Sequence, residues 1–260
     1  MKVRVYDENH HNDLRKSGRI LRGALELVSS AIRAGISTLE LDRIAERYIR
    51  ENGGEPSFKG YNGYLYSICV AVNDECIHGI PSKKRILQNG DIISIDCGVR
   101  YPKGKGGMCT DAARTYAVGK ISDEASALIE ACEGCFDAAV KDLKAGDMVG
   151  VIGQRIEAYI NGRYGIIDKY FGHGVGERVH EEPLVPNFDI TNTNIGKLKK
   201  IAETSLLEGG VIAIEPMINV GTKDVKVAAD GWTVRTQDGK LAAHYEQTLI
   251  IHKDNVEIVT

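Results

Sequence analysis

The sequence predicts an α+β fold made of two related halves. Two observations support this prediction. A pair of helical segments near the N-terminus returns downstream at a constant spacing of 111 residues. A short apolar strand that ends on an acidic residue also appears twice. A repeat of this length is too long for a solenoid and indicates a duplication, with two α+β halves packed about a pseudo-two-fold axis.

The first predicted pair of helices is separated by a break at Gly35. The first helix lies within residues 14–32, where apolar residues recur at helical spacing. The second begins at Ser37, which forms a capping box with Glu40, and it stops at Gly53. The apolar residues that define the two helices are Leu14, Leu21, Leu25, Val28 and Ile32, and then Leu41, Ile44, Ala45, Tyr48 and Ile49.

The second pair of helices is predicted on either side of Gly146. Its apolar residues are Leu128, Cys132, Phe136, Ala139 and Leu143, and then Ile152, Ile156, Tyr159 and Ile160. At the spacing of 111 residues, the matching positions are Ala34 and Ala145, Gly35 and Gly146, Glu46 and Glu157, Tyr48 and Tyr159, and Ile49 and Ile160. The two helix pairs are therefore expected to occupy equivalent places in the two halves.

Each half also supplies two acidic residues beside strands. Residues 90–96 and 209–215 share one pattern: Gly, any residue, two branched apolar residues, a small residue, Ile and an acid. The strands are therefore expected to end on Asp96 and Glu215. Asp111 and Glu246 each begin a further strand-like stretch.

The sequence predicts a single catalytic domain over residues 1–260. No Pro- or Ser-rich linker separates the halves, and the short stretch 119–124 is the predicted joint between them. The internal halves then span about 1–118 and 119–260. Because each half carries only two of the four acids, neither half is expected to work alone.

Composition excludes several functional classes. The chain has 33 Lys+Arg and 36 Asp+Glu, a formal net charge of −3 and 43% apolar residues, as soluble globular proteins do. Scattered basic residues argue against a nucleic-acid partner. The longest apolar runs are too short to span a membrane, and the charged opening residues do not match a signal peptide. Six cysteines are too few for a disulfide scaffold, so we expect a cytoplasmic protein.

The four strand-associated carboxylates predict a site for cations. An unpaired buried carboxylate costs several kcal/mol, and a bound cation is its natural partner. Two divalent ions would balance four negative charges, and carboxylates that bridge two ions about 3.5–4 Å apart are typical of metal-assisted hydrolysis. His173, flanked by glycines, adds an imidazole, and His180 follows it. This oxygen-rich set favours Mn, Fe, Co or catalytic Zn.

The motifs stand in the order found in type I methionine aminopeptidases, and the chain resembles that family over about residues 12–252. They are Cys76-Ile77-His78-Gly79-Ile80-Pro81, the Asp96 strand, the Asp111 strand, Gly172-His173-Gly174 with His180-Glu181-Glu182-Pro183, Ile214-Glu215-Pro216-Met217, and Tyr245-Glu246-Gln247-Thr248. The resemblance implies the pita-bread fold, in which two pseudo-two-fold-related halves share a central curved antiparallel sheet covered by helices.

The resemblance also implies a function. Such enzymes are metal-dependent aminopeptidases that remove the N-terminal methionine from nascent proteins when the second residue is small. A dinuclear centre of two divalent ions (Co, Mn, Fe or Zn) activates water for amide hydrolysis. The implied partners are the N-termini of nascent polypeptides, and the implied setting is a cytoplasmic monomer acting close to the ribosome.

Residue roles follow from the same resemblance. The implied metal ligands are Asp96, Asp111, His173, Glu215 and Glu246, with Asp111 and Glu246 bridging both ions. The implied catalytic residues are His78 and His180, which contact the substrate and stabilise the tetrahedral intermediate, and Glu215, which moves the proton of the attacking water. The implied pocket for the methionine side chain is formed by Phe58, Tyr61, Tyr64, Cys69, His78 and Trp232.

The sequence departs from the type I pattern in two places. His244 stands two residues before Glu246, where family members commonly have Gln. Residues i and i+2 of a strand share a face, so His244 is predicted to point toward the metals, where it could alter metal preference or add a proton acceptor. Residues 100–107, rich in Gly and Lys, predict a mobile hairpin tip longer than usual.

Two alternatives compete with methionine removal. Asp96-Cys97-Gly98 and residues 111–115 also resemble aminopeptidase P and prolidase, which act on Xaa-Pro bonds. Those enzymes usually carry an additional N-terminal domain, whereas only about ten residues precede the first predicted helix here. A non-catalytic binding homologue is the third possibility. Such relatives typically lose metal ligands and gain basic tails, and this sequence does neither.

Overall fold

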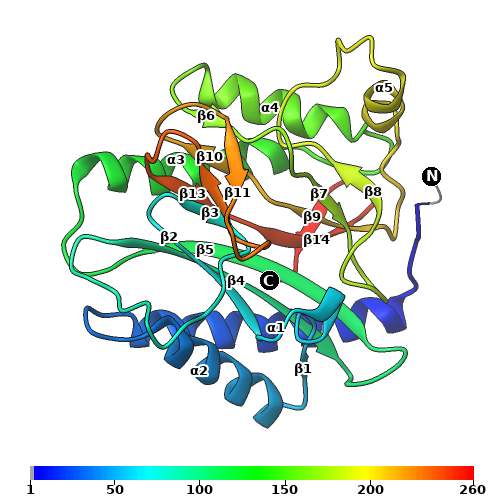
Figure 1. The fold of residues 1–260 in the computed structure, drawn as a ribbon. Helices are drawn as coiled ribbons and strands as arrows, with labels where there is room; N and C mark the ends of the chain where they lie inside the picture. The colour runs from blue at the N-terminus through cyan, green and yellow to red at the C-terminus, as the bar shows by residue number, and fades with distance from the viewer. Residues whose placement is uncertain (1–2) are drawn as a thin grey trace.

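The computed structural model describes residues 3–260, and its helices lie on both sides of a layer of strands (Figure 1). One pair, α1 (Glu8–Ala31) and α2 (Thr38–Glu51), covers one side of the strands. The other pair, α3 (Asp123–Val140) and α4 (Gly150–Ile160), covers the opposite side. This arrangement confirms the predicted α+β fold of two related halves. A short helix, α5 (Gly196–Ala202), was not predicted.

Side chains fix the starts of these helices as the sequence indicates. The Asp7 carboxylate accepts hydrogen bonds from the first backbone N–H groups of α1. Ser37 and Glu40 form the predicted capping box at the start of α2. Ser122 caps α3 with its hydroxyl alone, which accepts from the backbone N–H of Ala125. Helix α3 ends before Leu143, whose buried side chain packs from the following turn instead.

The strands pair in antiparallel fashion throughout residues 3–260. Their bounds are β1 Glu55–Pro56, β2 Ile68–Val72, β3 Glu75–Ile77, β4 Ile92–Tyr101, β5 Met108–Ala117, β6 Gly165–Ile166, β7 Gly172–Gly174, β8 Glu181–Val185, β9 Val211–Ile214, β10 Met217–Asn219, β11 Val225–Val227, β12 Val234–Thr236, β13 Ala242–His244, β14 Gln247–Ile251 and β15 Val256–Ile258, with a 3-10 turn at Tyr61–Gly63.

The two main sheets have matching centres. In the first half, β4 lies between β5 on one side and β2 with β1 on the other. In the second half, β9 lies between β14 and β7. Ser94 of β4 pairs with Ala71, and the equivalent Ala213 of β9 pairs with His173. The register therefore places His173 in the second half where Ala71 stands in the first.

The two sheets meet at Ala113 and Glu246. The backbone N–H of Glu246 donates to the carbonyl of Ala113 at 2.9 Å, and the reverse bond is 3.2 Å. The Thr248 hydroxyl links the two sheets again, because it accepts from the N–H of Asp111 at 2.9 Å and donates to its carbonyl at 2.8 Å. The central layer is thus assembled from both halves, with two of the four acids at the seam.

Each helix pair packs in the same way, as the repeat predicts. The Tyr48 hydroxyl of α2 lies against Gly23 of α1, where any Cβ would approach it to 2.1 Å. The Tyr159 hydroxyl of α4 lies against Gly134 of α3 with the same 2.1 Å limit. These pairs stand at the same spacing in the sequence. Each half also has its own buried apolar cluster, one within residues 21–118 and one mainly within 125–251.

Two predicted strand boundaries are wrong. Asp111 does not begin its strand, because β5 already starts at Met108 and pairs with β4 from there. Asp96 does not end its strand, because β4 continues to Tyr101 and pairs with β5 from Met108 onward. The two strands form one long hairpin, so the acid lies at its middle. Glu215 does directly follow its strand, β9. The hairpin tip at 102–107 is mostly exposed, and the predicted mobility of that tip stays a prediction.

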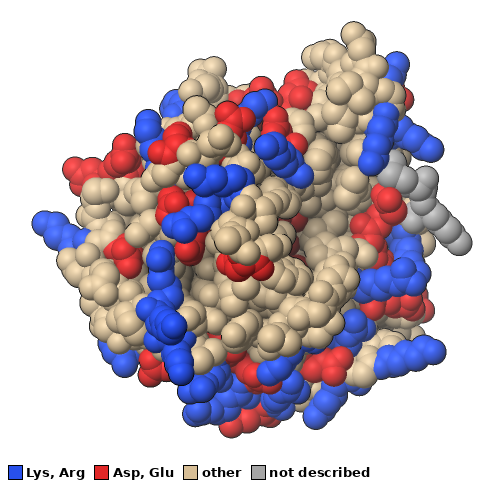
Figure 2. Space-filling model, viewed as in Figure 1, with Lys and Arg blue, Asp and Glu red and all other residues tan. Residues whose placement is uncertain are grey.

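The surface and the helices agree with the composition. Figure 2 shows Lys and Arg side chains intermixed with Asp and Glu on the face it presents, without a continuous basic field. Within residues 3–260, every helix is too short or too polar to cross a bilayer. All six cysteines are buried and carry free thiols.

Candidate active site

A cavity of about 390 Å³ opens where the two halves meet. All twelve residues predicted for the site line it, together with four that were not predicted to do so. The predicted ones are Phe58, Tyr61, Tyr64, Cys69, His78, Asp96, Asp111, His173, His180, Glu215, Trp232 and Glu246. The others are Asn62, Ile77, Tyr170 and Phe171. Tyr170 and Phe171 directly precede Gly172-His173, so an aromatic pair beside a glycine-flanked histidine was the available signal.

The acids reach the cavity from four backbone segments at the seam. Asp96 comes from β4 and Asp111 from β5, the two strands of the long hairpin. Glu215 follows β9, and Glu246 precedes β14. Asp111 and Glu246 are 2% and 3% exposed, so both carboxylates are essentially withdrawn from water.

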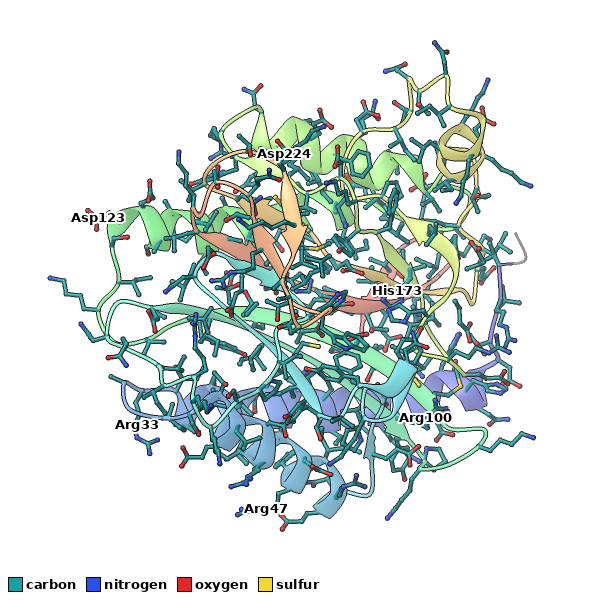
Figure 3. The ribbon with its side chains drawn as sticks, in the orientation of Figure 1. Arg33, Arg47, Arg100, Asp123, His173 and Asp224 are labelled. Carbon is teal, nitrogen blue, oxygen red and sulfur yellow. The ribbon has the colours of Figure 1, made fainter. Side chains whose placement is uncertain are left out.

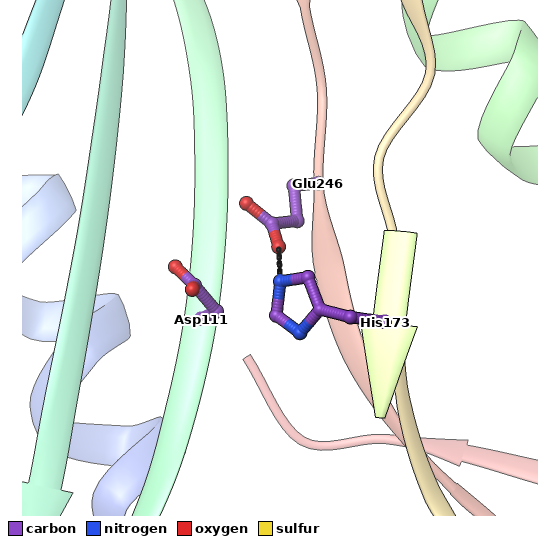
Figure 4. A group of neighbouring side chains, drawn as sticks. All are labelled: Asp111, His173 and Glu246. Atoms are coloured by element: carbon purple, nitrogen blue, oxygen red, sulfur yellow. Dashed lines mark ion pairs between the residues drawn. The ribbon is translucent and has the colours of Figure 1, made fainter. Parts of the chain in front are cut away.

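His173 joins these acids at close range. Asp111, His173 and Glu246 each offer one ligand atom, and these atoms lie within 4.8 Å of one another (Figure 4). His173 Nε2 lies 3.9 Å from Glu246 Oε1 and 3.6 Å from Glu215 Oε1. Ligand atoms that surround a small cation lie at distances of this size from one another.

The His173 ring is oriented by its own strand. Its Nδ1–H donates to the carbonyl of Gly174 at 2.9 Å, which leaves the Nε2 lone pair facing the acids. A Cβ at Gly172 would lie 2.4 Å from the Ala213 carbonyl, and one at Gly174 would lie 2.3 Å from the Glu182 carbonyl. The flanking glycines therefore permit close strand packing. Figure 3 places His173 in the interior, whereas Arg33, Arg47 and Asp123 lie at the periphery.

Burial and mutual repulsion shift the titration of the acids. Burial raises the pKa of Asp96 to about 7. The pKa of Asp111 is raised well above its usual range, first by burial and then by the neighbouring Glu246 and Asp96 carboxylates. Burial also raises the pKa of Glu215 and Glu246, each with a contribution from nearby acids. When four buried acids share one cavity, a negative charge on one of them disfavours ionisation of its neighbours.

The residues fit divalent cations. Within the described part of the chain, Asp96 Oδ1, Asp111 Oδ1 and Glu246 Oε1 are buried and lack hydrogen-bond partners. Buried polar atoms normally have partners, so these oxygens require an explanation. Carboxylates and a neutral imidazole are the ligands that Mn, Fe, Co and catalytic Zn take. Burial lowers the pKa of His173 to about 3, so its ring is neutral and able to ligate at physiological pH.

Two further histidines line the cavity. His78 has a backbone φ of 58°, a conformation that residues other than Gly seldom adopt. Such strain is typical of functional positions. Its neighbour Gly79 admits no side chain, since a Cβ would lie 1.8 Å from the Val70 carbonyl. His180 lies with its ring centroid 4.3 Å from that of His173, and its Nδ1 is 2.9 Å from the Tyr61 hydroxyl.

An aromatic wall adjoins these groups. The rings of Tyr64 and Trp232 pack with centroids 5.1 Å apart. The buried Tyr64 hydroxyl donates to the carbonyl of Ile68 at 2.9 Å, which fixes the end of its side chain. Cys69 is buried beside it, and burial raises the pKa of its thiol, which keeps it neutral. The wall is therefore apolar and uncharged.

His244 lies beside the acids, as its strand position predicts. Its ring is 2% exposed, and its Nε2 is 3.8 Å from Glu215 Oε2. The Glu215 carboxylate thus stands between two imidazoles, with His173 near Oε1 and His244 near Oε2. Neither ring nitrogen of His244 has a hydrogen-bond partner within residues 3–260. Burial lowers the pKa of His244 to about 3, so the ring is neutral.

Arg114 supports the backbone at Glu246. Its guanidinium donates to the Glu246 carbonyl and lies over the Tyr245 ring, 4.2 Å from the centroid. This contact fixes the backbone of Glu246 without occupying its carboxylate.

Comparisons with known proteins place this site in a family. Residues 12–253 match the family model described as Metallopeptidase family M24. The chain is 44% identical to the methionine aminopeptidase of Clostridium acetobutylicum over 248 residues, covering 95% of this chain and 94% of that protein. Among solved structures, the methionine aminopeptidase of Thermotoga maritima superimposes with a TM-score of 0.92 at 33% identity, covering 100% and 99% of the two chains.

The proline-directed branch is more distant. The prolidase of Pyrococcus furiosus superimposes with a TM-score of 0.76 at 23% identity, covering 98% of this chain and 65% of that one, which shows a shared fold alone. The family match, the curated relatives and the carboxylate–histidine cluster agree. The chain belongs to metallopeptidase family M24, and it is a metal-dependent aminopeptidase with the pita-bread fold.

Proposed function

We propose that this protein removes the N-terminal methionine from polypeptides whose second residue is small. The observation that carries the proposal is the cavity at the seam, because it combines five potential metal ligands, two further histidines and an aromatic wall. Three relatives that align with at least 95% of this chain are named methionine aminopeptidases, which supports the same substrate.

The proposed cofactor is a pair of divalent ions, Co, Mn, Fe or Zn. The residues that would hold them are Asp96, Asp111, His173, Glu215 and Glu246. When bound, such ions polarise a peptide carbonyl and lower the pKa of water to near neutrality. The unsatisfied carboxylate oxygens and the like-charge crowding of the pocket support this assignment.

The chain's own groups would then handle protons and orientation. Glu215, whose carboxyl has a raised pKa, is suited to accept the proton of the attacking water and to pass it to the leaving amine. Burial lowers the pKa of His78 to about 4, so this ring acts as a neutral hydrogen-bond partner of the substrate. His180 is neutral for the same reason and, with the Tyr61 hydroxyl on Nδ1, has its Nε2–H to donate to a developing oxyanion.

The aromatic wall is the proposed pocket for the methionine side chain. Phe58, Tyr61, Tyr64, Cys69, His78 and Trp232 would enclose it. An unbranched thioether suits such a slot, because sulfur contacts ring edges favourably. A branched side chain would fit a narrow aromatic slot less well.

We extend the proposal to the cellular setting. The substrates would be the N-termini of nascent polypeptides, and the enzyme would act close to the ribosome as a cytoplasmic monomer. Free thiols at all six cysteines and the intermixed surface charge accord with this setting.

The function is tested by stripping the protein with a chelator and restoring single divalent metals. Met-Ala-Ser should be cleaved only after metal is restored, and Xaa-Pro peptides should remain uncut. Release of free methionine is measured by chromatography. Cleavage without metal would overturn the proposal, and a preference for Xaa-Pro would assign the protein to the proline-directed branch.

His244→Gln provides a second test of the centre. Groups beside a ligating carboxylate tune metal affinity by roughly 10- to 100-fold, and Gln cannot reproduce an imidazole against Glu215 Oε2. We therefore expect the Kd for at least one divalent ion to change by about tenfold or more. Calorimetric titration of metal-free protein measures it. Identical affinities and pH profiles in both proteins would show that His244 has no part in the centre.

A further inference from the structure

The chain segment before α1 lies against the loop that carries His180. We call residues 3–7 the N-terminal arm and residues 175–180, between β7 and β8, the His180 loop. The Tyr6 hydroxyl donates to Glu181 Oε2 at 2.7 Å and accepts from the backbone N–H of Glu177 at 3.1 Å. A single phenol therefore ties Glu177, within the loop, to Glu181, which follows the loop. Tyr6 itself is 175 positions away from Glu181 in sequence.

Further contacts make this a built connection. A Cβ at Gly176 would lie 2.4 Å from the Tyr6 hydroxyl, so the ring packs directly on the loop backbone. Arg4 pairs with Glu177 and lies 3.7 Å from Glu181 Oε1. The arm itself is anchored, because the Tyr6 N–H donates to the carbonyl of Gly209 just before β9 at 2.9 Å.

The Glu181 carboxylate is the centre of this connection. Its side chain is 4% exposed, and its two oxygens have different partners. Oε2 accepts from Tyr6, and Oε1 accepts from the backbone N–H of Arg178 at 3.0 Å. Burial raises the pKa of Tyr6 to about 12, so its hydroxyl remains a donor at physiological pH. The Glu181 carboxylate thus bonds to the loop backbone through Oε1 and to Tyr6 through Oε2.

His180 depends on the loop for its position. Its one side-chain hydrogen bond among the described residues joins Nδ1 to Tyr61, which stands on a separate turn of the other half. The ring also packs on the rings of His173 and Tyr61, with centroids 4.3 Å and 5.1 Å away. Both neighbours belong to other segments, so the backbone of residues 175–180 sets where the imidazole stands relative to them and to the cavity.

We infer that Tyr6 is a positioning residue for catalysis: it clamps the His180 loop to Glu181 and thereby sets the place of His180 in the cavity. This inference rests on the proposed function, in which His180 contacts the substrate. Tyr6 touches neither the cavity nor any proposed metal ligand, so its effect must pass through the loop.

The test is a double-mutant cycle on metal-loaded enzyme with Met-Ala-Ser. Tyr6→Phe removes only the hydroxyl and is measured in two backgrounds, with His180 intact and with His180→Ala. Loss of geometric control over a substrate-contacting group costs about tenfold or more, so we expect kcat/KM to fall roughly tenfold with His180 present. In the His180→Ala background, Tyr6→Phe should change kcat/KM by less than about twofold.

Controls separate positioning from general damage. Tyr48→Phe deletes a half-buried hydroxyl on α2 that packs on Gly23 and lies outside the cavity lining, and it should leave kcat/KM unchanged. Metal affinity of Tyr6→Phe, measured by calorimetry, should equal that of the parent protein. Hydrogen exchange in the peptide covering residues 175–181 should rise in Tyr6→Phe alone.

The outcomes are distinct. Equal losses from Tyr6→Phe in both backgrounds, or no loss with His180 present, would overturn the inference while leaving the proposed function intact. Full activity of His180→Ala would instead overturn the proposed role of His180, and the inference would fall with it. A Tyr6→Phe effect confined to the His180 background supports both.

Discussion

Glu246→Gln is expected to lower kcat/KM by about 1,000-fold, equivalent to about 4 kcal/mol of transition-state stabilisation. The substitution keeps the shape of the side chain but removes one negative charge from a buried cluster in which His173 Nε2 lies 3.9 Å away. An amide offers one weaker acceptor oxygen where the proposed metal site would use a carboxylate. Steady-state hydrolysis of Met-Ala-Ser at saturating metal measures the loss.

The control and its companion are chosen for matched chemistry. Glu130→Gln makes the same change at an exposed position on α3 and should leave kcat/KM within about twofold of the parent value. Asp96→Asn should resemble Glu246→Gln, because it removes a second carboxylate from the same cavity. Full activity in either Glu246→Gln or Asp96→Asn would contradict the proposal that these carboxylates hold a pair of metal ions.

The metal-free protein is expected to lose thermal stability as pH rises. Burial raises the pKa of Asp96 from 3.8 to about 7, so folding favours its protonated form. That stabilising contribution is complete below about pH 4 and disappears as the pH rises through about 7. The pKa values of Asp111, Glu215 and Glu246 are raised in the same direction, so the four effects have one sign.

Differential scanning calorimetry in chelator checks this between about pH 5 and pH 8. Each kcal/mol lost should lower Tm by about 2–4 °C in a domain of this size. Adding a divalent ion at the higher pH should restore Tm, because cation binding then offsets the repulsion between carboxylates. The Tm of the metal-free Asp96→Asn variant should depend less steeply on pH. A flat or rising Tm for the metal-free parent protein would refute the pKa argument.

The acids were predictable from the sequence because burial makes them anomalous. A buried carboxylate next to a run of Ile and Val costs free energy unless a partner neutralises its charge. This pattern appears twice, so the sequence alone predicts Asp96 and Glu215 as site residues. Their place along the strand was less predictable. Local periodicity predicts a strand but does not specify its far end, and β4 extends beyond Asp96 because β5 pairs with all of it.

Contacts between distant segments lay beyond the sequence pattern. Tyr6 has no motif around it, and its partner Glu181 is 175 positions away. Ile77 enters the cavity wall because separate elements converge there, which composition cannot reveal. Helix α5 is only seven residues long and is fixed by packing on a small apolar cluster with Ile190, so its own propensity was too weak to predict it.

The register of the two sheets has a consequence for substrate orientation. A frame with two equivalent halves would receive a peptide equally well in either direction, yet a peptide has one amino end and one bond to be cut. One difference between the halves lies in this register: β7 presents the imidazole of His173 at the position where β2 presents the methyl group of Ala71. A peptide bound between the halves would therefore meet different chemistry on its two sides, which gives the site a direction.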